Sequence, residues 1–361
     1  MTTLRWADVD LGAVRANCAA ILAHLPTGAR LFAVVKAGGY GHGETQVAHA
    51  ALDGGASGLA VATLEEAAAL GELVPREHIL VMGGLVAAQA HAAAAGGWSI
   101  AVSSFELATA LGGTDTVVPV HMKIDTGMGR FGVSVEEAPA LARLIDQSAG
   151  LRLAGTWTHF ACADSDDAMT RAQFDRFRSA MTTLSTLGID PGMRHACNSA
   201  GALRHPEFAL DAVRCGIAIY GCEWPGTKPA LALRSVVTHV KTVAAGATVG
   251  YGATWMASGK RRVATVAIGY ADGVLRARSS RGDVLVRGRR APLIGVVSMD
   301  AITLDVTDIP AVEAGDIATL IGPDGEERIT AEEVAQWSNT ISYEVLTSIG
   351  SRVERRYHRH Q

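Results

Sequence analysis

The segment spanning residues 31–43 places a lysine where it could act as a nucleophile. Its apolar residues 31–35 predict a strand buried on both faces, and Lys36 follows the last of them. Four glycines within the next seven residues end any regular structure there. An amine held at a dry strand end loses hydration, which lowers its pKa and makes it nucleophilic toward a carbonyl. A solvated surface lysine is the ordinary alternative.

Two features beside the lysine favour the nucleophilic role. Tyr40 offers a hydroxyl, and glycines let backbone N–H groups approach a ligand closely. The sequence VVKAGGYGHG at residues 34–43 resembles the pyridoxal-phosphate lysine motif of alanine racemases. The resemblance implies that Lys36 forms a Schiff base with that cofactor. Gly38 departs from the motif, because the family usually has a larger residue there.

Residues 195–199 (HACNS) and 213–221 (VRCGIAIYG) offer a cradle for a phosphate, which this cofactor also needs. Small residues and free backbone N–H groups after a late strand suit a phosphate. Both segments resemble the phosphate segments of the same family. Ser199 has a second, compatible role as the cap of a short helix over residues 200–203. The groups assigned to the cradle are the Tyr40 hydroxyl, Ser199, and the backbone N–H groups of Gly216 and Ile217.

Arg214 is the candidate partner of the cofactor's ring nitrogen. Arginine stays protonated at any working pH, so it donates a hydrogen bond but keeps its proton. A ring nitrogen facing it therefore remains unprotonated and withdraws electrons weakly. A carboxylate in that place would protonate the ring and favour transamination or decarboxylation. Arginine suits the brief loss and return of one proton, which is what racemisation requires.

Racemisation needs a proton donor and acceptor on each face of the substrate's α-carbon. Lys36 is one such group once the substrate displaces it. The resemblance implies that Tyr251, in the segment VGYGAT at residues 249–254, is the other. Because an unperturbed tyrosine is a poor base near neutral pH, we expect His159 to hydrogen-bond its hydroxyl. Taken alone, His159 fits a satisfied core histidine better.

The segment KIDTGMGR at residues 123–130 supplies a candidate substrate clamp. Arg130 can hold a carboxylate and the cofactor's phenolic oxygen with its fork of donors. In the family, the lysine that matches Lys123 is often carbamylated, which turns a cation into an anion that orients the arginine. The resemblance further implies contacts from Met299 and Asp300 on the substrate side, from Tyr343 near the phosphate, and from Asp164, Tyr270 and Arg276 at the entrance.

The elements that must position these groups alternate between strand and helix. Short apolar runs begin near residues 31, 58, 79, 98, 117, 151, 193 and 212, with helix-like segments between them. This alternation predicts a parallel (β/α)8 barrel over residues 1–235, whose functional groups gather at the carboxyl ends of the strands. A doubly wound open sheet is the alternative, because the interval 200–210 is short for a helix.

The pattern changes after residue 235. Short β-branched runs separated by Gly-Asp and Pro-Asp-Gly turns predict a mainly β domain over residues 236–361, which contains Tyr251. One helix is expected over residues 330–337, with a capping box formed by Thr330 and Glu333.

Composition limits the partners. The chain has 361 residues, 48% of them hydrophobic and 19% charged, with a net charge of −4. No charge run favours nucleic acid, and no segment resembles a membrane span or a secretion signal, so we expect a cytoplasmic protein. The five cysteines show no Cys-x-x-Cys spacing, and no metal site is predicted.

The resemblance extends from residue 10 to residue 343. It implies a homodimer with shared active sites that interconverts L-alanine and D-alanine by two-base proton transfer and supplies D-alanine for peptidoglycan. A racemase of broader specificity is an alternative, since Val296 stands where the family commonly has arginine and Gly38 where it has a larger residue. A barrel-type decarboxylase would carry an acid in place of Arg214 and a longer glycine-rich phosphate loop. A non-catalytic cofactor carrier would lack the β domain.

Overall fold

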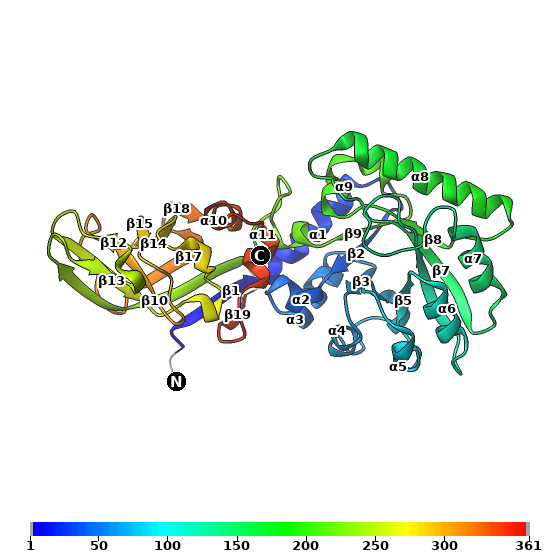
Figure 1. Ribbon diagram of the computed structural model, residues 1–361, viewed down its shortest axis with the longest axis horizontal. Helices are drawn as coiled ribbons and strands as arrows, with labels where there is room; N and C mark the ends of the chain where they lie inside the picture. Colours follow the sequence, from blue (N-terminus) through cyan, green and yellow to red (C-terminus); the bar gives the residue numbers. More distant parts are fainter. Residues whose placement is uncertain (1–2, 359–361) are drawn as a thin grey trace. The chain divides into compact units, whose positions relative to one another are not determined.

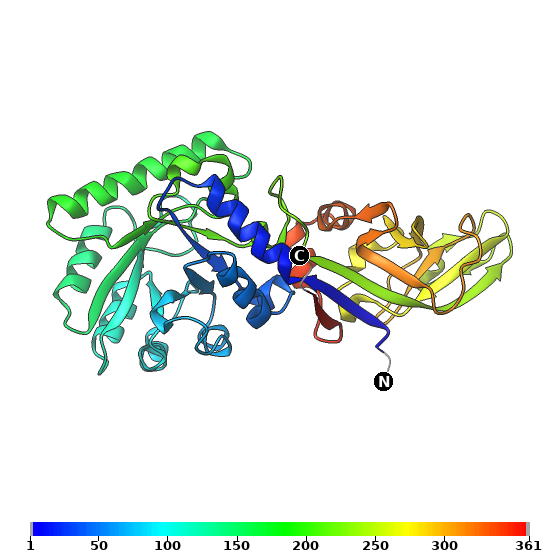
Figure 2. The same ribbon diagram turned by 180° about the vertical axis from the view of Figure 1, so that it is seen from behind.

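The chain forms two compact units in this computed structural model, which describes residues 3–358 (Figures 1 and 2). The barrel unit comprises Val14–Gly39 and Glu44–Thr227. The β-rich unit comprises Tyr40–Gly43, the described residues up to Ala13, and those from Lys228 onward. The expected boundary at residue 235 therefore lies inside the long strand β10 (Leu231–Val243).

Eight parallel strands close into a barrel in the order β2 to β9, which confirms the predicted fold. The ring closes where β2 pairs with β9. The strands are β2 (Arg30–Val34), β3 (Gly58–Val61), β4 (Ile79–Val81), β5 (Ser99–Val102), β6 (Val118–Lys123), β7 (Leu151–Trp157), β8 (Met193–His195) and β9 (Ala212–Cys215). Every residue of β3, β5, β6 and β9 is buried, as expected for strands covered on both faces.

Helices surround the barrel strands (Figure 1). They are α1 (Leu11–His24), α3 (Glu44–Asp53), α4 (Leu64–Ala69), α5 (Ala90–Gly96), α6 (Phe105–Gly112), α7 (Ala138–Gln147), α8 (Asp167–Thr186) and α9 (Ser199–Arg204), with α2 (Lys36–Tyr40) a distorted turn described below. Short 3-10 turns occur at Arg76–His78, Ala87–Gln89, Pro206–Phe208 and Ile217–Tyr220. No helix in the described part of the chain is long and apolar enough to cross a membrane.

The interior of the barrel is unusually polar. Phe32 of β2 packs edge-on against His121 of β6, although these strands are not neighbours, so both side chains point toward the barrel axis. His195 of β8 stacks on Trp157 of β7 with ring centroids 5.8 Å apart. Arg214 of β9 lies over the same tryptophan. A layer of aromatic, imidazole and guanidinium groups thus fills the barrel.

A nine-stranded sheet dominates the β-rich unit, in the order β18-β17-β14-β15-β16-β13-β10-β1-β19. Its strands are β1 (Arg5–Asp10), β10, β13 (Arg261–Val266), β14 (Asp283–Val286), β15 (Arg289–Ile294), β16 (Ile302–Asp305), β17 (Ile317–Asp324), β18 (Glu327–Ile329) and β19 (Glu354–His358). A separate pair joins β11 (Thr248–Val249) to β12 (Trp255–Met256), and 3-10 turns occur at Tyr251–Ala253, Tyr270–Asp272 and Arg276–Arg278.

Two helices complete this unit, α10 (Ala331–Ser338) and α11 (Ser342–Thr347). The predicted capping box is confirmed, because the Thr330 hydroxyl accepts from the Glu333 N–H and the Glu333 carboxylate accepts from the Thr330 N–H. The sequence pattern did not predict β1. This segment becomes a strand by pairing antiparallel with β10 and parallel with β19, two partners more than 200 residues away.

Gly41 permits a close backbone contact within the β-rich unit. Its φ is +80°, and a Cβ there would overlap the carbonyl oxygen of Leu346. We predict that Gly41→Ala lowers the free energy of unfolding by about 3 kcal/mol, since backbone strain and overpacking add. Gly246→Ala is the matched control, because its φ is +81° with nothing within 4 Å. Equal losses in chemical denaturation of both variants would contradict the steric part of this explanation.

Candidate active site

The carboxyl ends of the barrel strands bring the sequence-predicted groups of this unit to one end of the barrel. Lys36 follows β2, Lys123 ends β6, and His159 follows β7. Ser199 opens α9 after β8. Arg214 lies in β9, and Gly216 and Ile217 directly follow this strand. Tyr40, Tyr251, Met299 and Tyr343 belong to the β-rich unit.

The backbone after Lys36 forms a left-handed turn. The φ values of Ala37, Gly38, Gly39 and Tyr40 are 52°, 61°, 61° and 51°. The turn is closed by a hydrogen bond of 2.9 Å from the Gly39 N–H to the Val35 carbonyl. Left-handed geometry costs a non-glycine residue about 1–2 kcal/mol, and the turn contains two such residues. Surrounding contacts must therefore hold it in place.

The carboxylate of Glu66 supplies such a contact. Its Oε1 accepts from the Ala37 N–H at 2.8 Å, beside the lysine. Its Oε2 accepts from the N–H groups of Ala62 at 2.7 Å and Thr63 at 3.3 Å. The Thr63 hydroxyl in turn accepts from the Glu66 N–H, which forms a capping box at the start of α4. One side chain thus joins the loops after β2 and β3. Glu66 was not among the predicted site residues, although its Thr-x-x-Glu spacing is a recognisable cap signal.

The environment of Lys36 favours the neutral amine. Its side chain is half-buried. Burial lowers the pKa of Lys36, the positive charge of Arg130 lowers it further, and Glu66 acts in the opposite direction. A neutral amine is the form that attacks a carbonyl or accepts a proton.

Arg214 is 2% exposed and is surrounded by neutral acceptors. Its Nη1 donates to His195 Nδ1 at 2.7 Å, and its Nη2 donates to the carbonyls of Thr158 at 2.8 Å and Ala196 at 2.9 Å. The guanidinium carbon lies 4.7 Å from the centroid of the Trp157 ring. Burial lowers the pKa of Arg214 to about 10, so the group stays charged at neutral pH.

One donor of this guanidinium remains available. The Nε of Arg214 is buried and has no hydrogen-bond partner in the part of the chain that the structure describes. A buried donor without a partner carries a free-energy cost, which a ligand acceptor would remove.

Lys123 is a second buried cation without a hydrogen bond. Its side chain is 1% exposed, and its Nζ has no hydrogen-bond partner among residues 3–358. The Nζ lies 3.3 Å from the Phe131 ring centroid and 4.9 Å from that of Trp157. Burial and the charges of Arg130 and Arg214 lower the pKa of Lys123 to about 7. Much of this amine is therefore neutral near physiological pH.

The loop that carries Arg130 is shaped by Asp125. Its carboxylate accepts from the N–H groups of Gly127, Met128 and Gly129, each at 2.9 Å. Burial raises the pKa of Asp125, but these backbone donors outweigh it and hold the pKa below its usual value. Arg130 itself is exposed, with its guanidinium 5.1 Å from the Phe131 ring centroid.

The residues expected to hold a phosphate are partly assembled. The Ser199 hydroxyl accepts from the N–H groups of Gly216 at 3.1 Å and Ala218 at 3.4 Å, so it joins α9 to the loop after β9. The suggested capping role of Ser199 is wrong, because Asn198 caps α9 through a 2.9 Å bond from the Gly201 N–H to its side chain. Asparagine competes well for this position, and only the local backbone selects between the two.

The remaining predicted site residues are divided between the barrel unit and the β-rich unit. His159 Nδ1 lies 3.4 Å from Arg214 Nη2, and burial together with the charge of Arg214 holds the pKa of His159 well below its usual value. Its bond to Tyr251 stays a prediction. In the β-rich unit, Tyr40 packs against Tyr343 with ring centroids 6.0 Å apart, while Tyr251 is 72% exposed and Met299 51% exposed.

Comparison with known proteins decides the family. The model of the alanine racemase N-terminal domain matches residues 9–223, and that of the alanine racemase C-terminal domain matches residues 230–357. This chain belongs to the alanine racemase family. An alanine racemase from Symbiobacterium thermophilum is 42% identical over 364 residues, covering 98% of this chain and 96% of the relative. The resemblance inferred from the motifs is thereby confirmed.

Solved structures agree with this family membership. An alanine racemase from Bacillus anthracis with bound L-Ala-P has a TM-score of 0.92 and 36% identity, covering 99% of this chain and 96% of the other. An alanine racemase from D-cycloserine-producing Streptomyces lavendulae has the same TM-score and identity, covering 99% of this chain and 98% of the other.

The role of Glu66 is testable by an isosteric change. Glutamine has one acceptor oxygen where the carboxylate has two, so Glu66→Gln leaves either the Ala37 N–H or the N–H groups of the neighbouring loop without a partner. We predict a loss of about 1–3 kcal/mol in the free energy of unfolding, together with a lower kcat because Lys36 is less firmly placed. Denaturation and steady-state rates measure both effects. The exposed neighbour provides the control variant Glu65→Gln, and a loss there as large as in Glu66→Gln would refute the assignment.

Proposed function

We propose that this protein is a pyridoxal-phosphate-dependent alanine racemase that interconverts L-alanine and D-alanine. The observation that carries the proposal is the pair formed by a half-buried lysine of lowered pKa and a buried arginine with an unpartnered Nε, both at the carboxyl end of the barrel. Family membership supports it. An arginine in place of a carboxylate disfavours a decarboxylase.

The residues present fit the cofactor. The unpartnered Nε of Arg214 would donate to the ring nitrogen, and Lys36 would provide the covalent link. Ser199 and the backbone after β9 would hold the phosphate, with Tyr40 and Tyr343 contributing from the β-rich unit. When bound, the cofactor withdraws electrons from the substrate's α-carbon and so makes its proton acidic.

Lys36 and Tyr251 would move the proton on opposite faces of the substrate. Burial and the charge of Arg130 lower the pKa of Lys36, which makes its neutral, proton-accepting form easier to reach. His159, whose lowered pKa keeps it neutral, would accept a hydrogen bond from the tyrosine hydroxyl or donate one to its anion. Arg130 would hold the substrate carboxylate, and Met299 would line the substrate side.

We further propose that Lys123 is carbamylated. In carbamylation a neutral amine adds to carbon dioxide, forming an N–C bond and releasing one proton to solvent, and the pKa of Lys123 is lowered to about 7. The product is an anion, which would pair with Arg130. Its oxygens would also form hydrogen bonds in a place where the buried Nζ forms none.

The position of Lys36 is tested by chemical trapping. Borohydride reduction of the native enzyme, followed by peptide mass spectrometry, should locate the cofactor on Lys36. Lys36→Ala should lose racemase activity by orders of magnitude, because it removes a covalent and proton-moving group. Lys241→Ala, a change at an exposed lysine of β10, is the control and should keep full activity. A reduced adduct on another lysine would overturn the assignment.

Arg214 is predicted to determine the reaction type. Arg214→Glu should protonate the ring nitrogen, slow racemisation and raise the fraction of turnovers that end in transamination. The measured quantity is the ratio of pyruvate formed to alanine racemised, which does not depend on the amount of folded enzyme. Arg214→Lys retains a protonated donor and serves as the control. An unchanged ratio in Arg214→Glu would contradict the proposed role.

We propose a homodimer in which Tyr251 of one subunit completes the site of the other. Mixing the inactive variants Lys36→Ala and Tyr251→Ala then creates one intact site in each mixed dimer. Random reassociation should restore about a quarter of wild-type activity, since about half of the dimers are mixed. Mixing Lys36→Ala with Lys36→Met is the control and should restore none. If exchange is shown independently and activity stays absent in the first mixture, both residues act within one chain.

A further inference from the structure

A chain of buried hydrogen bonds leads from Arg214 to the opposite end of the barrel. Arg214 Nη1 lies 2.7 Å from His195 Nδ1, and His195 Nε2 lies 2.8 Å from His121 Nδ1. The three residues come from β9, β8 and β6. Their side chains are 2%, 0% and 4% exposed. No role was assigned to His121 or His195 in the sequence analysis.

The protons in this chain can be placed by elimination. A guanidinium only donates, so His195 Nδ1 must accept and be unprotonated. The proton of neutral His195 is then on Nε2, which donates to His121 Nδ1. His121 Nδ1 is therefore also unprotonated, and its own proton is on Nε2. Burial and the charges of Arg214 and Arg152 lower the pKa of His121 to about 3, and the pKa of His195 is also well below its usual value, so both rings are neutral.

Packing holds both rings in place. Trp157 stacks on His195 with an interplanar angle of 6°. Phe32 packs edge-on against His121, with ring centroids 6.4 Å apart. Gly155 leaves room for the His121 ring, because a Cβ at this position would lie 2.6 Å from His121 Nδ1. The rings therefore have little freedom to exchange one hydrogen-bonding nitrogen for the other.

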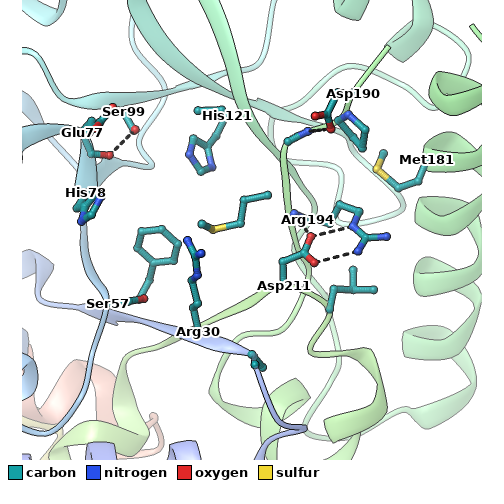
Figure 3. Close-up of a pocket in the computed structure, with 18 of the residues that line it drawn as sticks. Arg30, Ser57, Glu77, His78, Ser99, His121, Met181, Asp190, Arg194 and Asp211 are labelled. Carbon is teal, nitrogen blue, oxygen red and sulfur yellow. Dashed lines mark hydrogen bonds and ion pairs between the residues drawn. The ribbon is translucent and has the colours of Figure 1, made fainter. Parts of the chain in front are cut away.

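His121 also lines a cavity at the amino-terminal ends of the barrel strands (Figure 3). The cavity has a volume of about 1240 Å³. Two ion pairs line it, since Arg194 bonds to Asp211 at 2.8 Å and Arg152 to Glu77 at 2.6 Å. Water in this polar cavity can solvate the outer part of the His121 ring, on the side of the barrel opposite to Lys36.

We propose that His121 is a positioning residue for Arg214 and acts on it through His195. Arg214 sets the tautomer of His195, and His121 Nδ1 accepts the resulting Nε2 proton, which holds the ring in the orientation that receives the guanidinium. Without this acceptor the buried Nε2 proton has no partner, so the His195 ring can shift toward another acceptor and displace the guanidinium that faces the cofactor. This inference rests on the proposed function of Arg214.

Three variants test the proposal in the intact enzyme. His121→Leu removes the acceptor and should lower kcat about tenfold with little change in KM, as expected for the loss of one buried hydrogen bond that acts through Arg214. His121→Asn restores an acceptor oxygen near the position of Nδ1 and should recover most of the rate. The control is His78→Leu, since His78 lines the same cavity but is exposed and lies outside this chain of bonds. It should match the wild type.

A second measurement does not depend on activity. Nitrogen-15 NMR of histidine-labelled protein distinguishes protonated from unprotonated ring nitrogens, and the His195 signals are assigned from the spectrum of His195→Gln. The wild type should show His195 with a proton on Nε2 and none on Nδ1. The His121→Leu variant should keep this tautomer, but its Nε2 proton signal should shift upfield and exchange faster with solvent, because its acceptor is gone.

The outcomes separate this proposal from the proposed function. A proton on Nδ1 of His195 in the wild type, or a charged imidazole at neutral pH, would overturn the proposal even if His121→Leu fails to fold. So would a His121→Asn variant as slow as His121→Leu, because packing rather than hydrogen bonding would then explain the loss. A wild-type protein without racemase activity would refute the proposed function, while the NMR result still decides the tautomer of His195.

Discussion

The burial of a permanently charged guanidinium inside a closed barrel is the constraint on which the rest of the site depends. Arg214 has no carboxylate partner among the described residues and is neutralised by no counter-ion. Its charge is instead distributed over backbone carbonyls, an imidazole and the face of Trp157. Removing any acceptor would leave a buried donor without a partner, which costs more than an ordinary hydrogen bond contributes.

The positive charge imposed by Arg214 and Arg130 explains the state of the neighbouring titratable groups. Burial and both cations lower the pKa values of Lys123 and His159, and burial with the charge of Arg214 lowers that of His195. The pKa of Lys36 is lowered as well, chiefly by burial and by the charge of Arg130. The imidazoles of the site are thus neutral near physiological pH, and the charged forms of both lysines are disfavoured. Such groups can form covalent bonds and exchange protons, whereas permanently charged ones would repel one another.

Backbone geometry complements this electrostatic arrangement. The strained left-handed turn after Lys36 is held by Glu66, whose carboxylate binds one N–H of this turn and two of the loop after β3. Asp125 binds three successive N–H groups of the loop before Arg130. In both places the carboxylate charge is used in backbone hydrogen bonds. The reactive residues are therefore placed by rigid loops on a rigid barrel.

Local sequence determined the barrel strands, Lys36 and Arg214, because a strand buried on both faces is a continuous apolar run and the site residues follow its end. The capping box of α10 could also be predicted from the sequence, since all its atoms lie within four residues. Tertiary structure alone decided β1 and β19, because β1 becomes a strand by pairing with distant β10 and β19, and β19 by pairing with β1. Tertiary structure also decided the hydrogen bonds from Ala37 to Glu66 and between His195 and His121. A local sequence pattern does not predict which donor and acceptor come together from different parts of the barrel unit.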